Sequence, residues 1–90
     1  MMKKNDVVTV VTVSGEYIGK YEKEESGVIY LTDPRMLIAG DQGVGFARGI
    51  CMTGTENPTH CAFQQYVYVT ETNPDFAKAY REAVSGLQLV

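Results

Sequence analysis

Two cysteines and one histidine are the residues of this sequence that most readily suggest chemistry. Cys51 and Cys61 are the only cysteines among the 90 residues, and His60 is the only histidine. A structural zinc site normally takes four ligands in paired clusters, and a disulfide framework needs an oxidising compartment that no feature of the chain indicates. A nucleophile and its base would need a third group to orient the base, and no carboxylate stands at a recognisable spacing from His60. The sequence therefore predicts two unlinked, metal-free thiols and no catalytic site.

Carboxylates cluster at Glu22, Glu24 and Glu25. Such a cluster could supply a general acid and base or oxygen ligands for calcium. It runs directly into Ser26-Gly27, a dipeptide typical of an exposed turn. A solvated group of charges is the simpler interpretation, and we expect neither a metal nor another cofactor.

Three glycines, Gly40, Gly43 and Gly45, stand close together in a stretch that could let backbone N–H groups approach a phosphate. The stretch lacks the GxGxxG order, has no Lys-Ser/Thr ending and does not join a strand to a helix. We interpret it as a flexible connection.

Charge and hydropathy narrow the class of protein further. The formal net charge is −3 and the isoelectric point is about 5.0, the wrong sign for a general nucleic-acid binder. The longest apolar stretches, residues 10–13 and 36–39, fall far short of the roughly 20 residues needed to cross a bilayer. The start at Lys3-Lys4 lacks the apolar block of a signal peptide. We therefore expect a cytoplasmic protein with no membrane partner.

Strands must position most of these residues. Val and Thr fill residues 7–13, and residues 16–23 alternate in character, which predicts two strands joined by a tight turn. Gly15 belongs to that turn. Gly19 interrupts the second strand, where glycine indicates a sharp bend or the close approach of another backbone.

The later strands are less regular. Residues 28–31 predict a third strand, closed by Asp33-Pro34. We expect an irregular, strongly bent fourth strand between residues 35 and 52, and a fifth over about residues 61–70 that forms a hairpin with the fourth. Residues 1–90 thus form a single domain, mainly β, with its strands in about residues 7–70.

A C-terminal helix is predicted over about residues 74–85. Asn73 can cap it, Pro74 suits its first position, Asp75 favours the positive end of its dipole and Gly86 can end it. The stripe expected to dock holds Phe76, Ala79, Tyr80, Ala83 and Val84.

Residues 11–15 with Tyr17 and Gly19, followed by residues 28–33, resemble the first signature block of Sm-like (LSm) proteins. The likeness covers about residues 8–33, and the sequence is most similar in style to the diverged Sm-like proteins of marine phages, including cyanophages. Three residues separate Gly15 from Gly19, where the family usually has four. If a phage encodes the chain, the expected compartment is the host's cytoplasm.

The resemblance implies a small five-stranded, strongly bent antiparallel Sm-like or SH3-like barrel that forms a homo-oligomeric ring, here of five to seven subunits. It also implies single-stranded RNA as a partner. The family's RNA pocket has an Asn and a stacking side chain in the turn after the second strand, and Glu24-Glu25-Ser26-Gly27 offers neither. Arg48-Gly49 matches the family's Arg-Gly pair, although an Arg and a bending Gly within a strand are the simpler explanation of the dipeptide.

The fifth predicted strand is a candidate subunit interface. Residues 61–70 contain no Lys, Arg or Pro, the usual guards of an exposed strand edge. The residues expected at the interface are Phe63, Tyr66, Val67, Tyr68 and Val69. Aromatic residues could instead stack on bases, but few basic residues stand near them. We expect a non-catalytic, ring-forming module with a role in RNA binding or as an RNA chaperone; the alternative is a phage structural or assembly protein that makes only protein contacts.

Overall fold

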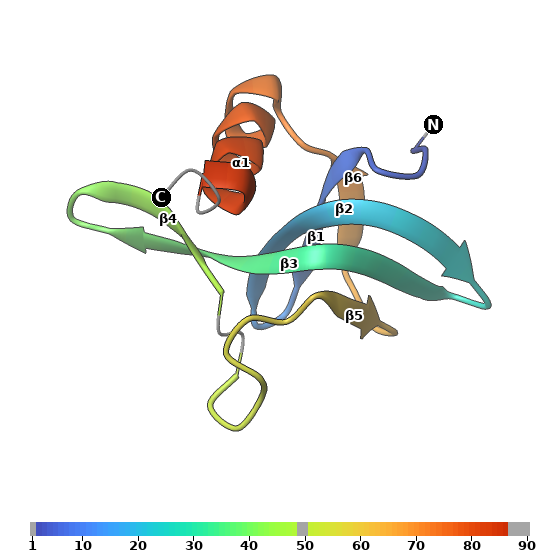
Figure 1. Cartoon of the computed structure of the whole chain (residues 1–90). Coiled ribbons are helices and arrows are strands. Elements are labelled where there is room, and N and C mark those ends of the chain that lie inside the picture. Colours follow the sequence, from blue (N-terminus) through green and yellow to red (C-terminus); the bar gives the residue numbers. More distant parts are fainter. Residues whose placement is uncertain (1, 49–50, 87–90) are drawn as a thin grey trace.

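The structure, a computed structural model, describes residues 2–48 and 51–86 of the chain. These residues form six strands followed by one helix (Figure 1). The strands are β1 (Val7–Thr12), β2 (Gly15–Glu25), β3 (Val28–Gly40), β4 (Gly43–Ala47), β5 (His60–Phe63) and β6 (Tyr68–Glu71), and the helix is α1 (Pro74–Gly86). The predicted class, mainly β with a C-terminal helix, is confirmed.

All strand pairs are antiparallel, and the main path through the sheet is β4-β3-β2-β1-β6. β5 lies off this path and pairs with the first half of β3, whereas β4 pairs with the second half. The expectation of five strands is wrong, because two short strands share one edge of β3. Across the described part of the chain the sheet is strongly bent but not closed, since no pairing joins β5 to β6.

The predicted end of the third strand at Asp33-Pro34 is wrong, because β3 continues through this dipeptide to Gly40. Asp33 adopts a left-handed conformation with φ of 50°. Proline has no N–H to donate to a neighbouring strand. On its outer side, however, β3 pairs with β5 before this point and with β4 after it, so Pro34 lies between the two ladders and no ladder bond is lost. The dipeptide therefore kinks the strand instead of ending it.

The predicted fifth strand over residues 61–70 is also wrong, as is its hairpin with the fourth. The chain bends at residues 64–67 and splits this segment into β5 and β6. β5 then pairs with β3, and β6 pairs with β1 at the far side of the path. The bend lets a short segment contribute to two separate parts of the sheet.

The glycine-rich stretch forms a hairpin instead of a flexible connection or a phosphate loop. Gly40 pairs with Gly43, leaving Asp41 and Gln42 as a two-residue turn. Gly43 has φ of 116°, a conformation that side chains disfavour. The end of β3 and β4 thus form an arm that extends away from the body of the sheet (Figure 1).

One hydrophobic core lies on the concave face of the sheet. Val8, Val10, Ile29 and Leu31 are completely buried there. The partly buried residues around them are Met2, Tyr21, Cys61, Phe63, Tyr66 and Val69.

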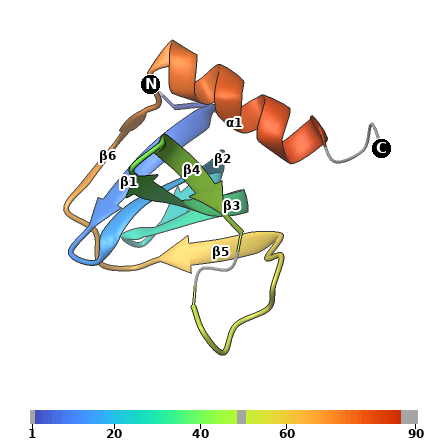
Figure 2. The ribbon, with the colours of Figure 1, turned by 90° about the vertical axis from the view of Figure 1, so that its left-hand side faces the viewer.

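A second core lies on the opposite face, beneath α1. Val7, Ile18 and Tyr80 are buried in it. Because Val7 and Val8 point into different cores, the start of β1 is covered on both faces, which is consistent with its continuous run of Val residues. Figure 2 shows α1 lying across this side of the sheet.

The helix begins as predicted, because the side chain of Asn73 accepts hydrogen bonds from the backbone N–H groups of Asp75 (2.8 Å) and Phe76 (3.4 Å). The docked stripe is different from the predicted one. Ala77, Tyr80 and Val84 pack against the sheet, as their partly or fully buried side chains show. Phe76 is 41% exposed, and Ala83 faces solvent.

α1 is too short to span a membrane, and the structure describes no other helix.

The two predicted structural glycines occupy restricted positions. Gly15 has φ of 152°. At buried Gly19, a Cβ would lie 3.1 Å from the Leu31 side chain and from the Thr32 carbonyl oxygen. The β2–β3 register also shifts between Ile18 and Lys20. Close approach of β3 therefore accounts for a glycine at position 19.

Candidate binding surfaces

The residues that first suggested chemistry are dispersed in the structure. Cys51 is an exposed free thiol in the loop before β5, and Cys61 is a half-buried free thiol within β5. Burial raises the pKa of the Cys61 thiol from 9.0 to about 11, although a backbone hydrogen bond at Leu31 opposes the shift. His60 is exposed, and its ring nitrogen contacts the Thr59 hydroxyl at 3.1 Å. Over residues 2–48 and 51–86, no group of three His, Cys, Asp or Glu side chains could hold a metal ion.

The carboxylate cluster lies at the end of β2, and its members are engaged in surface contacts. Glu24 accepts a hydrogen bond of 2.6 Å from the Tyr66 hydroxyl, and this bond raises the pKa of Tyr66. Glu25 forms an ion pair with Lys23 at 3.5 Å. The turn itself is only Ser26-Gly27, so this hairpin is tighter than the four-residue turn that the sequence indicated.

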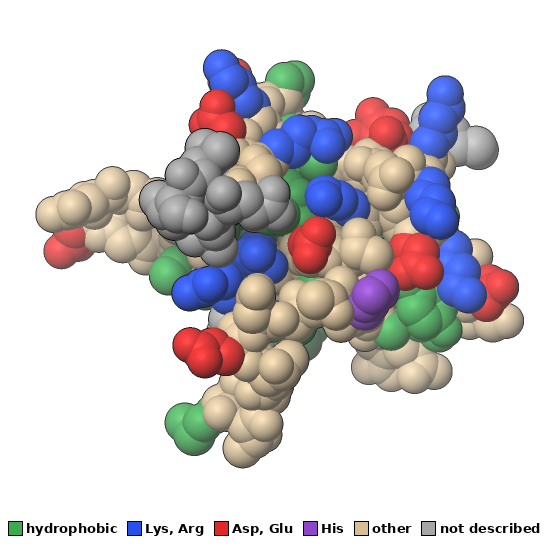
Figure 3. Space-filling view, in the orientation of Figure 1, with side chains coloured by type: hydrophobic (Ala, Val, Ile, Leu, Met, Phe, Trp, Pro, Cys, Tyr) green, Lys and Arg blue, Asp and Glu red, His purple; other side chains and the backbone are tan. Residues whose placement is uncertain are grey.

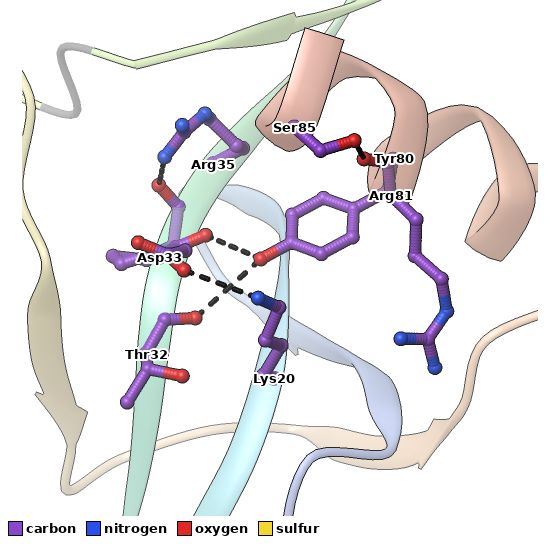
Figure 4. Close-up of polar contacts among 8 residues, drawn as sticks. Lys20, Thr32, Asp33, Arg35, Tyr80, Arg81 and Ser85 are labelled. Atoms are coloured by element: carbon purple, nitrogen blue, oxygen red, sulfur yellow. Dashed lines mark hydrogen bonds and ion pairs between the residues drawn. The ribbon is translucent and has the colours of Figure 1, made fainter. Parts of the chain in front are cut away.

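A polar cluster surrounds the kink of β3 (Figure 4). The Tyr80 hydroxyl donates to the Asp33 carbonyl at 2.6 Å, which ties α1 to the kink. The Asp33 carboxylate pairs with Lys20 Nζ at 3.4 Å. Arg35 is only 4% exposed, and its guanidinium donates to the Pro34 carbonyl at 2.9 Å.

This cluster carries more positive than negative charge. Burial raises the pKa of Tyr80, as does the charge of Asp33, while the charges of Arg35 and Arg81 oppose the shift. Lys20 of β2 pairs with the Asp33 carboxylate, and the charges of Arg35 of β3 and Arg81 of α1 act on Tyr80, with the Arg81 side chain extending away from Asp33 (Figure 4). Figure 3 shows several Lys and Arg side chains over the central part of this face. We call Lys20, Arg35 and Arg81 the basic cluster.

The predicted Arg48-Gly49 site is only partly described. Arg48 is exposed and directly follows β4. Gly49 lies outside the described residues. Arg48 thus lies in the connection between β4 and β5, not within a strand. A role of the Arg48-Gly49 pair in RNA binding stays a prediction.

The five predicted interface residues divide into two groups. Phe63, Tyr66 and Val69 pack against the concave core, and the Phe63 ring lies 5.0 Å from the Tyr17 ring. Val67 and Tyr68 are 68% and 59% exposed. These two side chains are the most exposed of the five.

Two strand edges are open at the ends of the sheet path. In the described chain β4 pairs only with β3, and β6 pairs only with β1. β4 has the sequence Gly-Val-Gly-Phe-Ala and carries no charged side chain. β6 contains neither a basic residue nor a proline, the usual guards against edge pairing.

An apolar groove of about 730 Å³ lies on the helix-bearing face of the sheet. Its floor is formed by β1 and β2, one wall by the β3–β4 arm, and the other by β6 and the start of α1. Figure 2 looks onto this side, with β6 to the left of β4 and α1 above them. Exposed apolar residues in its lining are Ile38, Val44, Tyr68 and Phe76.

Sequence reasoning missed this groove, because its residues come from positions 9 to 76 and meet only through the bend of the sheet. No family model matches the chain, and no curated protein is similar to it.

Proposed function

We propose that this chain is a non-catalytic, self-associating module of the Sm-like type, whose copies join edge to edge into a ring. The observation that carries the proposal is the pair of open strand edges at the two ends of the sheet path, on β4 and β6. Unpaired backbone groups at an edge are satisfied when another chain adds a strand. Because β4 and β6 are different edges, contacts between them are heterologous and close as a ring when the rotation allows.

The exposed side chains on these edges favour protein contacts. Val44 on β4 is 48% exposed and Tyr68 on β6 is 59% exposed. Tyrosine is enriched at interfaces, because its ring contributes apolar area while its hydroxyl stays solvated or hydrogen-bonded. A short chain also gains stability from association, since a small domain buries a small fraction of its surface.

The Sm-like version of the proposal rests on the strand order. β1 to β4 form a meander, and the last strand returns to pair with the first. The fourth strand and the last strand are therefore at the ends of the path. The resemblance to Sm-like proteins implies that subunits contact each other through these two strands. A virion or assembly protein that uses the same edges only for protein contacts is the alternative within this proposal.

Light scattering coupled to size-exclusion chromatography tests the association. The wild-type chain should run at five to seven times 9.9 kDa at micromolar concentration. Val44→Lys and Tyr68→Lys should each lower that mass, because a lysine guards an edge. Proline at Val67 is a poor probe, since the Val67 N–H donates to the Val11 carbonyl within the sheet.

The control is Val13→Lys, a substitution at a turn residue that is 98% exposed and belongs to neither edge strand. It should leave the mass unchanged. A wild-type mass of one subunit, or an equal effect of all three lysines, would contradict the ring.

The basic cluster favours RNA as a second candidate ligand. Lys20 and Arg81 place positive charge at the surface of an acidic chain, while Arg35 is buried, so any phosphate contact should be local. Oligo(U) and oligo(A) should bind with an affinity that falls as salt rises. Arg81→Ala should reduce the salt dependence, whereas Lys78→Ala on the same helix should change it less. Absence of binding at low salt would remove RNA but leave the ring untouched.

A further inference from the structure

The groove continues the surface on which α1 is seated. Ile18 and Leu37 belong both to the core beneath α1 and to the lining of the groove. α1 covers the part of the sheet around Val7, while Thr9 and Val11 on the same strand line the uncovered part. The same face of the sheet thus packs against one amphipathic helix, α1, and leaves a neighbouring apolar surface uncovered.

The charged residues around this uncovered apolar surface are acidic. The charged residues of the lining are Glu16 and Glu71, and no Lys or Arg lines the groove among the described residues. Asp41 at the tip of the arm is also acidic and exposed. The basic cluster is formed instead around the kink of β3, outside the groove lining. The groove therefore complements an apolar segment that carries positive charge.

We propose that the groove binds an amphipathic helix of another protein, with an apolar stripe that enters the groove and Lys or Arg residues that face Glu16 and Glu71. The volume of about 730 Å³ lies within the range of roughly 300 to 1,000 Å³ that is usual for ligand sites. Helices docked in grooves present residues at intervals of three and four, as α1 does with Ala77, Tyr80 and Val84. The groove shares Val44 and Tyr68 with the two edge strands, whereas Ile38 and Phe76 belong to the groove and to neither edge strand.

The probe is a dye-labelled synthetic peptide of about 16 residues with leucine on one helical face and lysine on the other, a length at which helices become stable. Its matched control has glutamate in place of every lysine. Fluorescence anisotropy with the full chain should show saturable binding of the lysine peptide and binding at least about tenfold weaker for the glutamate peptide.

Two pairs of variants test the location of the site. Ile38→Asn should weaken binding by about tenfold because it removes apolar area, while Val13→Asn should not change it. Glu16→Lys should weaken binding of the lysine peptide by about threefold. Glu56→Lys makes the same charge change at an exposed loop residue outside the groove and should have a smaller effect.

The outcomes separate this proposal from the proposed ring. Ile38 is on β3 and belongs to neither of the edge strands β4 and β6, so Ile38→Asn should leave the oligomeric mass unchanged. Equal affinity for both peptides, equal effects of the Glu16 and Glu56 variants, or no binding at millimolar peptide would overturn the groove site. A monomeric chain that binds the lysine peptide would refute the ring and leave the groove site intact.

Discussion

The two halves of β3 have similar apolar content, but they differ in how far other elements cover their side chains. Ile29 and Leu31, before the kink at Asp33, are completely buried, whereas Ile38 after it is 52% exposed. The first half lies between β2 and β5 and faces the concave core. The second half extends into the arm with β4 and leaves the body of the sheet. Apolar residues in a strand therefore define a core only where other elements cover them, and the uncovered half supplies a wall of the groove.

The largest expected difference between the halves is in side-chain truncation. Leu31→Ala should lower the free energy of unfolding by about 2–5 kcal/mol, because it leaves a cavity in the concave core. Ile38→Ala in the second half should cost less than about 1 kcal/mol. Urea denaturation of both variants measures the contrast, and similar losses would show that the arm is packed as tightly as the core.

Glycine substitution should show the same contrast. Gly19→Val should cost more than about 1 kcal/mol, because a Cβ there meets Leu31 and the Thr32 carbonyl at 3.1 Å. Gly45→Val beside the second half is the matched control, since its Cβ would meet Ile38 at an ordinary 3.7 Å. The denaturation midpoint should fall for the first variant and change little for the second. An unchanged midpoint for Gly19→Val would refute close approach at this position.

The kink between the halves is held by the Tyr80 hydroxyl. Tyr80→Phe should lower stability by about 1 kcal/mol, because the buried Asp33 carbonyl loses its donor. Tyr66→Phe removes an exposed hydroxyl that bonds to Glu24, and it should cost less. If both variants unfold at the wild-type midpoint, the contact between α1 and the kink contributes nothing measurable to the fold.

The smallest expected effect is on the rate of alkylation of Cys61, which lies beside the first half of β3. Cys61 pairs with Leu31, and its pKa of about 11 leaves roughly one thiol in a thousand ionised at pH 8. Cys51 is exposed and should be alkylated first by iodoacetamide. Raising the pH toward 11 should accelerate modification of Cys61 while the chain stays folded. Mass spectrometry of timed digests follows both sites, and faster labelling of Cys61 at pH 8 would contradict its burial.

Local patterns predicted the first two strands and the start of the helix well. β-branched residues and a tight turn suffice for β1 and β2, and the Asn73 cap acts over only two or three residues. The later strands depended on contacts distant in sequence. Pro34 suggested an end to β3, but its missing N–H is harmless where the outer edge changes partner from β5 to β4.

The candidate sites were less predictable than the strands. The interface assigned to residues 63–69 assumed one continuous strand, and the bend at residues 64–67 turns Phe63 and Val69 into the core instead. The predicted helix stripe included Tyr80 and Val84 correctly but missed Ala77, because Ala77 is small and Phe76 gave the stronger apolar signal. Neither the groove nor the basic cluster has a local pattern, since each assembles from several elements.

The shared edge of β3 has a consequence for engineering. The chain leaves that edge after β4 and returns to it at β5, and its residues 51–57 on the way are exposed. The two strands are held by β3 independently, so a longer connection would increase mainly the entropy of closing a loop, which grows slowly with length. This loop is thus a natural place to insert a peptide tag or a small folded domain without altering the sheet. In a ring, such insertions would display one copy of the added sequence on every subunit.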